Sequence, residues 1–333
     1  MSRVRVSSGR IGFRTARVAA LVLVPIAVTL WLFRVPYPDR YDSSLFTAPT
    51  ADAGMRFAVV GDFGVAGRSA ADVGKLIASW NPEFVLSVGD NNYPDGAAST
   101  IDANIGQYYH SYIAPYKGTY GQGAQANRFF PVLGNHDWNT TGARPYLDYF
   151  TLPGNERYYD FAQGQVHFFA IDSDPHEPDG ITATSVQGKW LQQKLAAAKE
   201  PWKIVYFHHP PYSSGDHGST HDLQWPFREW GASVVLSGHD HDYERVVLDG
   251  FPYFVDGLGG SSIYNFNAPI PGSVVRYSGE YGAMLVSADD LTMTYQFIAR
   301  TGKLIDTYVA CLERGWHPGE ISCMTAGNGG RTR

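Results

Sequence analysis

Seven side chains that could bind metal ions lie in five short segments in the middle of this chain. They offer carboxylate, amide, phenol and imidazole donors, the groups that hard divalent and trivalent ions prefer. In chain order they are Asp62, Asp90, Tyr93, Asn135, His208, His239 and His241. Any one segment alone is usually a turn or a surface pair. Together they are a donor set for two metal ions a few ångströms apart, and such a pair hydrolyses phosphate esters.

The elements that must position these ligands are predicted β-strands, because each segment follows a β-rich apolar run. The runs before the segments are 57–60, 84–88, 129–133, 203–207 and 233–236, with a further run at 166–171. Helical patterns occur at 70–80 and at 185–199, where Ser185 is the predicted N-cap. Strands alternating with helices favour sheets covered by helices. Since strand ends are rigid and their loops converge, we expect the ligands to meet in one crevice.

The rest of the chain supports the site less directly. The strand-rich part after residue 244, with runs at 251–255, 282–287, 291–298 and 304–309, is expected to form a second sheet packed on the first. The stretch 94–127 is predicted to be mostly loop near the site, with a short helix near 104–112. The glycine-rich segment 257–262 lacks the lysine and the following helix of a phosphate-binding loop, so it is predicted to be a turn. Asp137 and Asp240, beside ligands, are expected to orient imidazoles.

The five segments, in this order, resemble the calcineurin-like metallophosphoesterases, and Tyr93, three residues after Asp90, narrows the resemblance to the purple acid phosphatases. The small, tartrate-resistant members share a Trp-Leu-x-x-x-Leu helix, here at 190–195, and a His-Gly-Ser-Thr-His run, here at 217–221. The resemblance extends from about residue 56 to residue 309. It implies an α/β fold, a four-layer α/β/β/α sandwich in which two mixed β-sheets pack face to face with helices outside.

The resemblance also assigns the ligands and the catalytic histidines. By it, the first metal would be bound by Asp62, Asp90, Tyr93 and His241, and the second by Asn135, His208 and His239, with Asp90 bridging. His136 would contact the substrate phosphate, while His217 and His221 would orient the phosphate or protonate the leaving group. A surface position without a role is the alternative for both His217 and His221. His209 matches a position that the family fills variably, so we expect it to support the ligands rather than bind metal.

The identity of the metal is inferred from one position at which this sequence differs from many metallophosphoesterases. Many metallophosphoesterases carry Asp-x-His in the first segment, with that histidine as a ligand, but here the position is Gly64. Tyr93 replaces the lost donor, as in the purple enzymes. Two carboxylates and a phenolate leave about +2 on an Fe(III)–M(II) pair, which attracts a phosphate monoester. The expected cofactor is therefore Fe(III) with a second divalent metal, Fe, Zn or Mn; the alternative is a core tyrosine beside a divalent pair.

The function predicted from these residues is hydrolysis of small phosphate monoesters at acidic pH through a metal-bound hydroxide. A phosphodiesterase or nucleotidase with a divalent metal pair is the alternative within the same class. A membrane-tethered, non-catalytic binding protein on the same fold is the alternative of another class, and the intact ligand set argues against it. The formal net charge of −6 over 333 residues gives no indication of nucleic acid binding.

The amino-terminal region predicts export. Five arginines and no acidic residue precede the apolar run 18–33. As a helix the run spans about 24 Å, short of the ~30 Å hydrocarbon core. An uncleaved single-pass anchor is favoured because the nearest Ala-x-Ala, at 51–53, lies well past the run. A cleaved signal peptide, giving a secreted or periplasmic protein, and a buried helix are the alternatives. Either leading interpretation places the rest of the chain outside the cytoplasm.

The predicted domain organisation has four parts. They are a signal anchor or signal peptide at 1–34, a linker at 35–55, a metallophosphoesterase domain at 56–310 and a carboxyl-terminal tail at 311–333. The only cysteines are Cys311 and Cys323. Outside the cytoplasm such a pair can form a disulfide, and two free thiols are the alternative.

Overall fold

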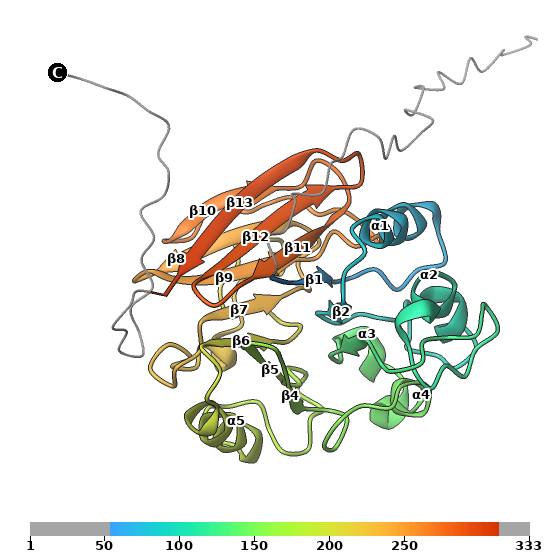
Figure 1. Cartoon of the computed structure of the whole chain (residues 1–333), viewed down its shortest axis with the longest axis horizontal. Helices are drawn as coiled ribbons and strands as arrows, with labels where there is room; N and C mark the ends of the chain where they lie inside the picture. The colour runs from blue at the N-terminus through green and yellow to red at the C-terminus, as the bar shows by residue number, and fades with distance from the viewer. Residues whose placement is uncertain (1–53, 313–333) are drawn as a thin grey trace, which may run out of the picture. The chain divides into compact units, whose positions relative to one another are not determined.

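Two β-sheets with helices on their outer sides form the described part of this protein (Figure 1). The structure is a computed structural model and describes residues 54–312. The first sheet is mixed, with β1, β2 and β3 parallel to one another and the other strands antiparallel. Its strand order is β13 (Leu304–Cys311), β12 (Thr292–Ala299), β11 (Gly282–Ala288), β1 (Met55–Val60), β2 (Phe84–Ser87) and β3 (Phe129–Pro131).

The second sheet is mixed as well. Its parallel centre consists of β5, β6, β7 and β9, and its remaining strands are antiparallel to their neighbours. Its strand order is β10 (Ser273–Tyr277), β8 (Tyr243–Leu248), β9 (Phe251–Asp256), β7 (Val234–Ser237), β6 (Trp202–Tyr206), β5 (Val166–Ala170) and β4 (Tyr159–Gln163).

The main core lies between the two sheets. Successive side chains of a strand point to opposite faces, and in β5 Phe168 belongs to the core between the sheets while Phe169 belongs to a second cluster on the outer face. The rings of Phe57 in β1 and Phe168 in β5 meet edge to face at 5.2 Å between ring centres, which joins the sheets directly. Truncating a fully buried ring of this kind to alanine costs about 3–5 kcal/mol.

Helices cover the outer faces of both sheets. Val73, Leu76 and Ile77 of α1 (Arg68–Ser79) pack on the first sheet. Leu191 and Leu195 of α5 (Val186–Ala197) pack on the outer face of the second. The shorter helices are η2 (Asp102–Gly106), α2 (Gln107–Tyr109), η3 (His110–Tyr112), α3 (Asn135–Trp138), η4 (Thr141–Ala143), α4 (Arg144–Tyr149) and η5 (His221–Leu223). This arrangement confirms the predicted α/β/β/α sandwich.

Local predictions agree closely with the structure. The Ser185 side chain accepts a hydrogen bond from the Gly188 amide and caps α5 as predicted. The strands before the metal ligands begin and end within a few residues of the predicted runs. The stretch 94–127 contains η2, α2 and η3 where a short helix was expected, and is otherwise irregular.

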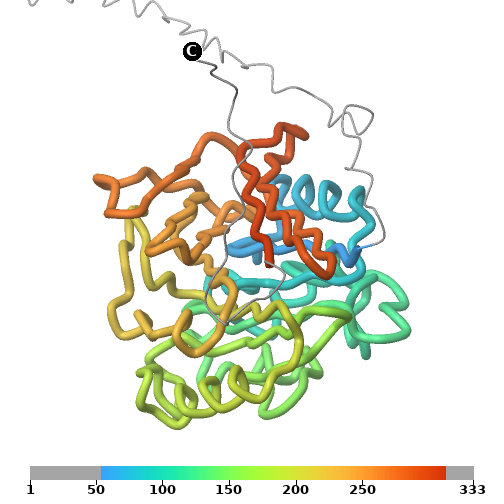
Figure 2. Tube along the Cα trace, turned by 60° about the vertical axis from the view of Figure 1, so that its left-hand side comes forward, coloured from blue at the N-terminus to red at the C-terminus, as the bar shows by residue number. Residues whose placement is uncertain are grey.

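The predicted assignment of the carboxyl-terminal strands to a separate second sheet is wrong. β11 pairs antiparallel with β1, so β11, β12 and β13 extend the first sheet. The blue amino-terminal and red carboxyl-terminal strands accordingly lie side by side in Figure 2. β8 and β9, in contrast, join β7 in the second sheet. An alternating apolar pattern identifies a strand but not the strand beside it. β1 pairs with β2 along one edge, and the sequence pattern does not show that β11 pairs along the other.

Two expectations concern the chain ends. Among residues 54–312, no helix is long and apolar enough to cross a membrane. The predicted anchor at 18–33 and nearly all of the predicted linker lie outside the described residues. Cys311 at the end of β13 is disulfide-bonded, which excludes two free thiols, and the chain's other cysteine, Cys323, lies outside the described range.

Candidate metal centre

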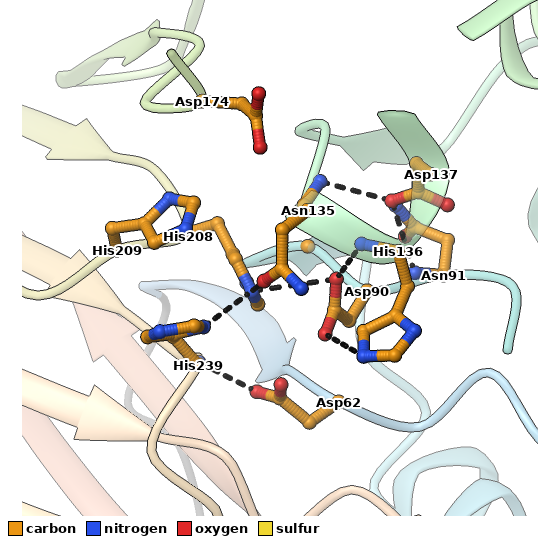
Figure 3. Close-up of polar contacts among 12 residues, drawn as sticks. Asp62, Asp90, Asn91, Asn135, His136, Asp137, Asp174, His208, His209 and His239 are labelled. Atoms are coloured by element: carbon orange, nitrogen blue, oxygen red, sulfur yellow. Dashed lines mark hydrogen bonds and ion pairs between the residues drawn. The ribbon is translucent and has the colours of Figure 1, made fainter. Parts of the chain in front are cut away.

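The predicted ligands come together at the carboxyl ends of parallel strands from both sheets. Asp62, Asp90 and Asn135 follow β1, β2 and β3 of the first sheet. His208 follows β6, and His239 follows β7, in the second. Because parallel strands end at the same edge of a sheet, and the two sheets face each other, these loops converge on one site. Figure 3 shows side chains from both sheets directed toward one another there.

The first donor group consists of four atoms, and the Tyr93 hydroxyl lies within hydrogen-bonding distance of the other three. The Tyr93 hydroxyl lies 2.9 Å from Asp90 Oδ2, 3.2 Å from Asp62 Oδ1 and 3.0 Å from His241 Nε2. His241 Nε2 lies 3.3 Å from Asp62 Oδ1. Two carboxylates, a phenol and an imidazole thus face a common point.

The second donor group shares Asp90 with the first. His208 Nε2 lies 3.3 Å from Asp90 Oδ1, 3.0 Å from Asn135 Oδ1 and 3.2 Å from His239 Nδ1. Figure 3 shows the contact between Asp90 and His208. The two oxygens of the Asp90 carboxylate therefore face different donor groups, Oδ2 the first and Oδ1 the second. This is the geometry of a carboxylate that bridges two ions.

The backbone around the ligands is held in conformations that few residues adopt. Asp62, Asp90 and His239 have φ values of 56°, 51° and 71°. Left-handed backbone at residues other than glycine costs of order 1–3 kcal/mol and clusters at functional sites. At Gly64, a side chain would begin 2.1 Å from the backbone carbon of Asn91. The structure therefore leaves no room for the histidine that other metallophosphoesterases carry at this position.

The imidazole ligands are oriented by groups that the sequence analysis did not identify. His208 Nδ1 lies 2.9 Å from the Val88 carbonyl oxygen, and His241 Nδ1 lies 2.7 Å from Ser262 Oγ. A hydrogen bond at one ring nitrogen directs the other toward the metal position. Ser262 belongs to the glycine-rich segment 257–262, whose Ser261 amide also donates to the Asp62 carbonyl oxygen. The Val88 carbonyl could not be identified from the sequence, because every residue has a backbone carbonyl. The glycine-rich segment 257–262 was noticed in the sequence but was predicted only to be a turn.

The expectation that Asp137 and Asp240 orient imidazoles is wrong. Asp137 Oδ2 accepts hydrogen bonds from the Gly134 amide at 2.9 Å and from Asn91 Nδ2 at 2.9 Å, so it ties the loop after β3 to the loop after β2. Asp240 accepts from the Ser213 hydroxyl and from the His217 amide. Both carboxylates hold backbone segments in place, because backbone amides rather than ring nitrogens are within their reach.

The charged side chains of the centre shift one another's pKa values. Burial alone would raise the pKa of Asp90, but the charge and hydrogen bond of His208 hold that pKa well below its usual value. Burial alone would lower the pKa of His208, but the Asp90 charge raises it to about 10. Burial and the charges of Asp62 and Asp90 raise the pKa of Tyr93 well above its usual value. At neutral pH His208 and Tyr93 therefore carry protons, which a bound cation must displace.

The three predicted catalytic histidines lie in different surroundings. The His136 amide donates to Asp90 Oδ1 at 2.9 Å, its Nδ1 lies 2.5 Å from the Pro94 carbonyl oxygen, and its Nε2 lies 3.9 Å from Asp90 Oδ2. The exposed His217 stacks its ring on His239 at 4.3 Å. His221 is exposed in η5, and within residues 54–312 its ring has no hydrogen bond or ring contact. The structure thus brings His136 and His217 to the centre; a role for His221 stays a prediction.

Two further ring side chains lie at the centre: Tyr264, which the sequence analysis did not single out, and His209, which it expected to support the ligands. The Tyr264 ring stacks on His241 at 4.1 Å with an angle of 6° between the planes. His209 lies against His208 and His239, with ring centres 5.0 Å and 4.4 Å away. Burial, followed by the charge of His208, lowers the pKa of His209 to about 3, so its imidazole is neutral.

The residues fit a pair of metal ions. Within each of two groups, one ligand atom per residue lies within 4.8 Å of the others. The groups are Asp62, Asp90 and His241, and His208, His209 and His239. Tyr93 joins the first group through its hydroxyl and Asn135 joins the second through its amide oxygen. The first group is richer in oxygen donors, and the second in imidazole nitrogen. Hard cations prefer the former, and borderline divalent ions the latter.

Comparison with known proteins identifies the family. The calcineurin-like phosphoesterase family matches residues 55–243. Tartrate-resistant acid phosphatase type 5 of Oryctolagus cuniculus is 25% identical over 303 residues, covering 72% of this chain and 86% of that protein. Two solved structures share the fold, each with a TM-score of 0.63 and 19% identity. One is a purple acid phosphatase from yellow lupin (Lupinus luteus), and the match covers 78% of this chain and 54% of the lupin chain. The other is GAP50, the anchor in the inner membrane complex of Plasmodium, and the match covers 79% of this chain and 90% of the GAP50 chain. The chain belongs to the calcineurin-like phosphoesterase family of hydrolases and is similar, within it, to the tartrate-resistant and purple acid phosphatases.

Proposed function

We propose that this protein is a dinuclear metal-dependent phosphatase that hydrolyses small phosphate monoesters at acidic pH. The observation that carries the proposal is the Asp90 carboxylate, whose two oxygens face two separate donor groups, with the Tyr93 hydroxyl completing the first. A phenol at this position suits a trivalent ion, because a phenolate is a hard, negatively charged oxygen donor.

The proposed metals are Fe(III) at Asp62, Asp90, Tyr93 and His241, and divalent Fe, Zn or Mn at Asp90, Asn135, His208 and His239. Bound there, the pair would neutralise the charge of the phosphate and supply a hydroxide nucleophile even at acidic pH. The protein's own contribution is to hold these donors rigidly at strand ends.

The histidines around the centre would bind the substrate and move protons. The Pro94 carbonyl accepts a hydrogen bond from His136 Nδ1, which leaves Nε2 directed toward Asp90. When protonated, Nε2 can donate to a phosphate oxygen. His217, exposed and stacked on His239, is placed to protonate the leaving oxygen. Both steps need a protonated imidazole, and this requirement is the reason for proposing activity at acidic pH.

The decisive experiment combines metal analysis, a visible spectrum and kinetics on the purified protein. The proposal expects two metals per chain, one of them iron, a visible tyrosinate–Fe(III) band and faster hydrolysis of a monoester such as p-nitrophenyl phosphate than of the matching diester. A colourless, fully active protein that contains only divalent ions and prefers the diester would instead establish the phosphodiesterase alternative.

A non-catalytic role on this fold is the second candidate, and the fold shared with the Plasmodium anchor protein is the observation behind it. The ligand set argues against it. All seven expected ligands are present, and each has at least one donor atom within 3.3 Å of another ligand. A metal-free, inactive protein after anaerobic reconstitution with iron and zinc would favour the non-catalytic role.

We also propose that the catalytic domain acts outside the cytoplasm. The disulfide at Cys311 suits an oxidising compartment. Whether the segment 18–33 tethers the domain is decided by amino-terminal sequencing of the mature protein. An intact terminus supports a tether, and a start at or beyond Pro36 indicates a cleaved signal peptide.

A further inference from the structure

His209 lies in the second donor group together with two histidines already described as ligands. The ring centres are 5.0 Å apart for His208 and His209, 4.4 Å for His209 and His239, and 5.0 Å for His208 and His239. One ligand atom from each of the three lies within 4.8 Å of the others. Figure 3 shows the three imidazoles gathered on the same side of Asn135.

These separations are those of three imidazoles around one ion. A metal–nitrogen bond of about 2.1 Å places a ring centre about 3.2 Å from the metal. Two such rings at bond angles of about 90–110° then have centres about 4.5–5.2 Å apart. Two of the observed separations, both 5.0 Å, lie in this range, and the third, 4.4 Å, lies just below it.

The surroundings of His209 orient its ring as those of a ligand. Ser173 Oγ lies 2.9 Å from His209 Nδ1 and also accepts a hydrogen bond from the His209 amide at 2.9 Å. The arrangement parallels His208, whose Nδ1 bonds the Val88 carbonyl and whose Nε2 faces the donor group. With Nδ1 engaged, Nε2 of His209 is the nitrogen left for a metal. Neighbouring residues within a strand point to opposite faces of the sheet. His208 and His209 lie beyond the end of β6 at Tyr206, so both of their rings can point toward His239.

We propose that His209 is a ligand of the second metal ion and makes that site a three-imidazole site that favours Zn(II) over Mn(II). The proposal rests on the proposed function, since it concerns one of the two metals of that centre. Imidazole suits zinc, whereas carboxylate and carbonyl donors suit manganese. Ser173 is a positioning residue in this scheme, because it acts on the metal only through the His209 ring.

The test measures metal binding directly. Metal-free wild-type protein and the His209→Ala, His209→Gln and Ser173→Ala variants are titrated with Zn(II) and, separately, with Mn(II), and the bound metal is counted after dialysis. For zinc at the second site we expect a loss of at least about 100-fold in affinity for both His209 variants and of about 10-fold for Ser173→Ala. The loss for manganese should be several-fold smaller, so the Zn/Mn preference falls.

Two controls guard against an unspecific effect. His176→Ala removes a neighbouring exposed histidine whose ring bonds Asp174 and stacks on Trp138, and it should leave both affinities unchanged. Selective ¹⁵N-histidine labelling of the wild-type protein needs no variant. Zinc should change the chemical shift of four ring nitrogens, one each from His208, His239, His241 and His209. The fourth of these signals should be absent from His209→Gln.

Unchanged zinc and manganese binding in the His209 variants, or no zinc-dependent shift of a His209 nitrogen in the wild type, would overturn the proposal. If the wild type then still binds two metals and hydrolyses monoesters, only the role of His209 fails. If it binds neither metal, the proposed function fails with it.

Discussion

Replacing Tyr93 by phenylalanine tests the first metal site most sharply. The hydroxyl is the atom that all the other donors of the first group share: Asp90 Oδ2 at 2.9 Å, His241 Nε2 at 3.0 Å and Asp62 Oδ1 at 3.2 Å. Phenylalanine keeps the ring, which packs against His136 at 4.3 Å. The variant therefore removes one donor of four without opening a cavity.

The expected magnitude has two parts. In the metal-free protein the pKa of Tyr93 is raised, so the side chain is a neutral donor to a carboxylate, and its loss should cost about 1.5–3 kcal/mol of unfolding free energy. In the metal-loaded protein the first metal should bind at least about 100-fold more weakly, an additional ~2.7 kcal/mol. Since a ligand stabilises the fold by mass action, the stabilisation by metal should shrink by a similar amount.

The assay is chemical unfolding of the wild type and Tyr93→Phe, each with and without metals, alongside metal content and the visible spectrum. Tyr264→Phe is the matched control, because its ring stacks on His241 while no hydrogen bond of its hydroxyl occurs within residues 54–312. It should keep both the colour and the metal stabilisation. A Tyr93→Phe protein that keeps its colour and wild-type retention of the first metal would refute the assignment of Tyr93 as a ligand.

Three further predictions concern catalysis by His136, the loop 113–127 and the buried carboxyl group of Asp256. His136→Ala should lose at least about 100-fold in kcat while retaining both metals by elemental analysis, because its ring is assigned to the substrate; an emptied metal site would contradict that role. Asp102→Asn should speed proteolysis within 113–127, since the Asp102 carboxylate accepts hydrogen bonds from the Tyr116 hydroxyl and the Thr119 amide; an unchanged cleavage rate would contradict this. Burial and the charge of Asp62 raise the pKa of Asp256 well above its usual value, so its stabilising contribution is present at low pH and falls as pH rises above about 4. Asp256→Asn should therefore gain unfolding free energy relative to the wild type between pH 4 and pH 7, by up to about 1.4 kcal/mol per pH unit in urea titrations, and equal pH profiles would disprove the charge argument.

The candidate ligands could be located in the sequence because each lies in a loop that follows a strand, and the sequence itself reveals those strands. Residues 57–60 are apolar and buried in β1, and Asp62 follows. Local signals of the same kind located α5, where Ser185 caps the first turn. Such features depend on a few neighbouring residues, so composition and spacing suffice to identify them.

Only the tertiary structure decided which strands are neighbours and which groups orient the ligands. β1 pairs with β11, more than two hundred residues away, because a strand's pattern specifies its buried face and not its partner. The Val88 carbonyl that orients His208 is common to every residue and has no signature in the sequence. Ser262 reaches His241, and His209 reaches His239, only because loops from different strands end at the same place. The sequence alone determined which atoms could bind metal, while the packing of the two sheets decided which of them face a common point.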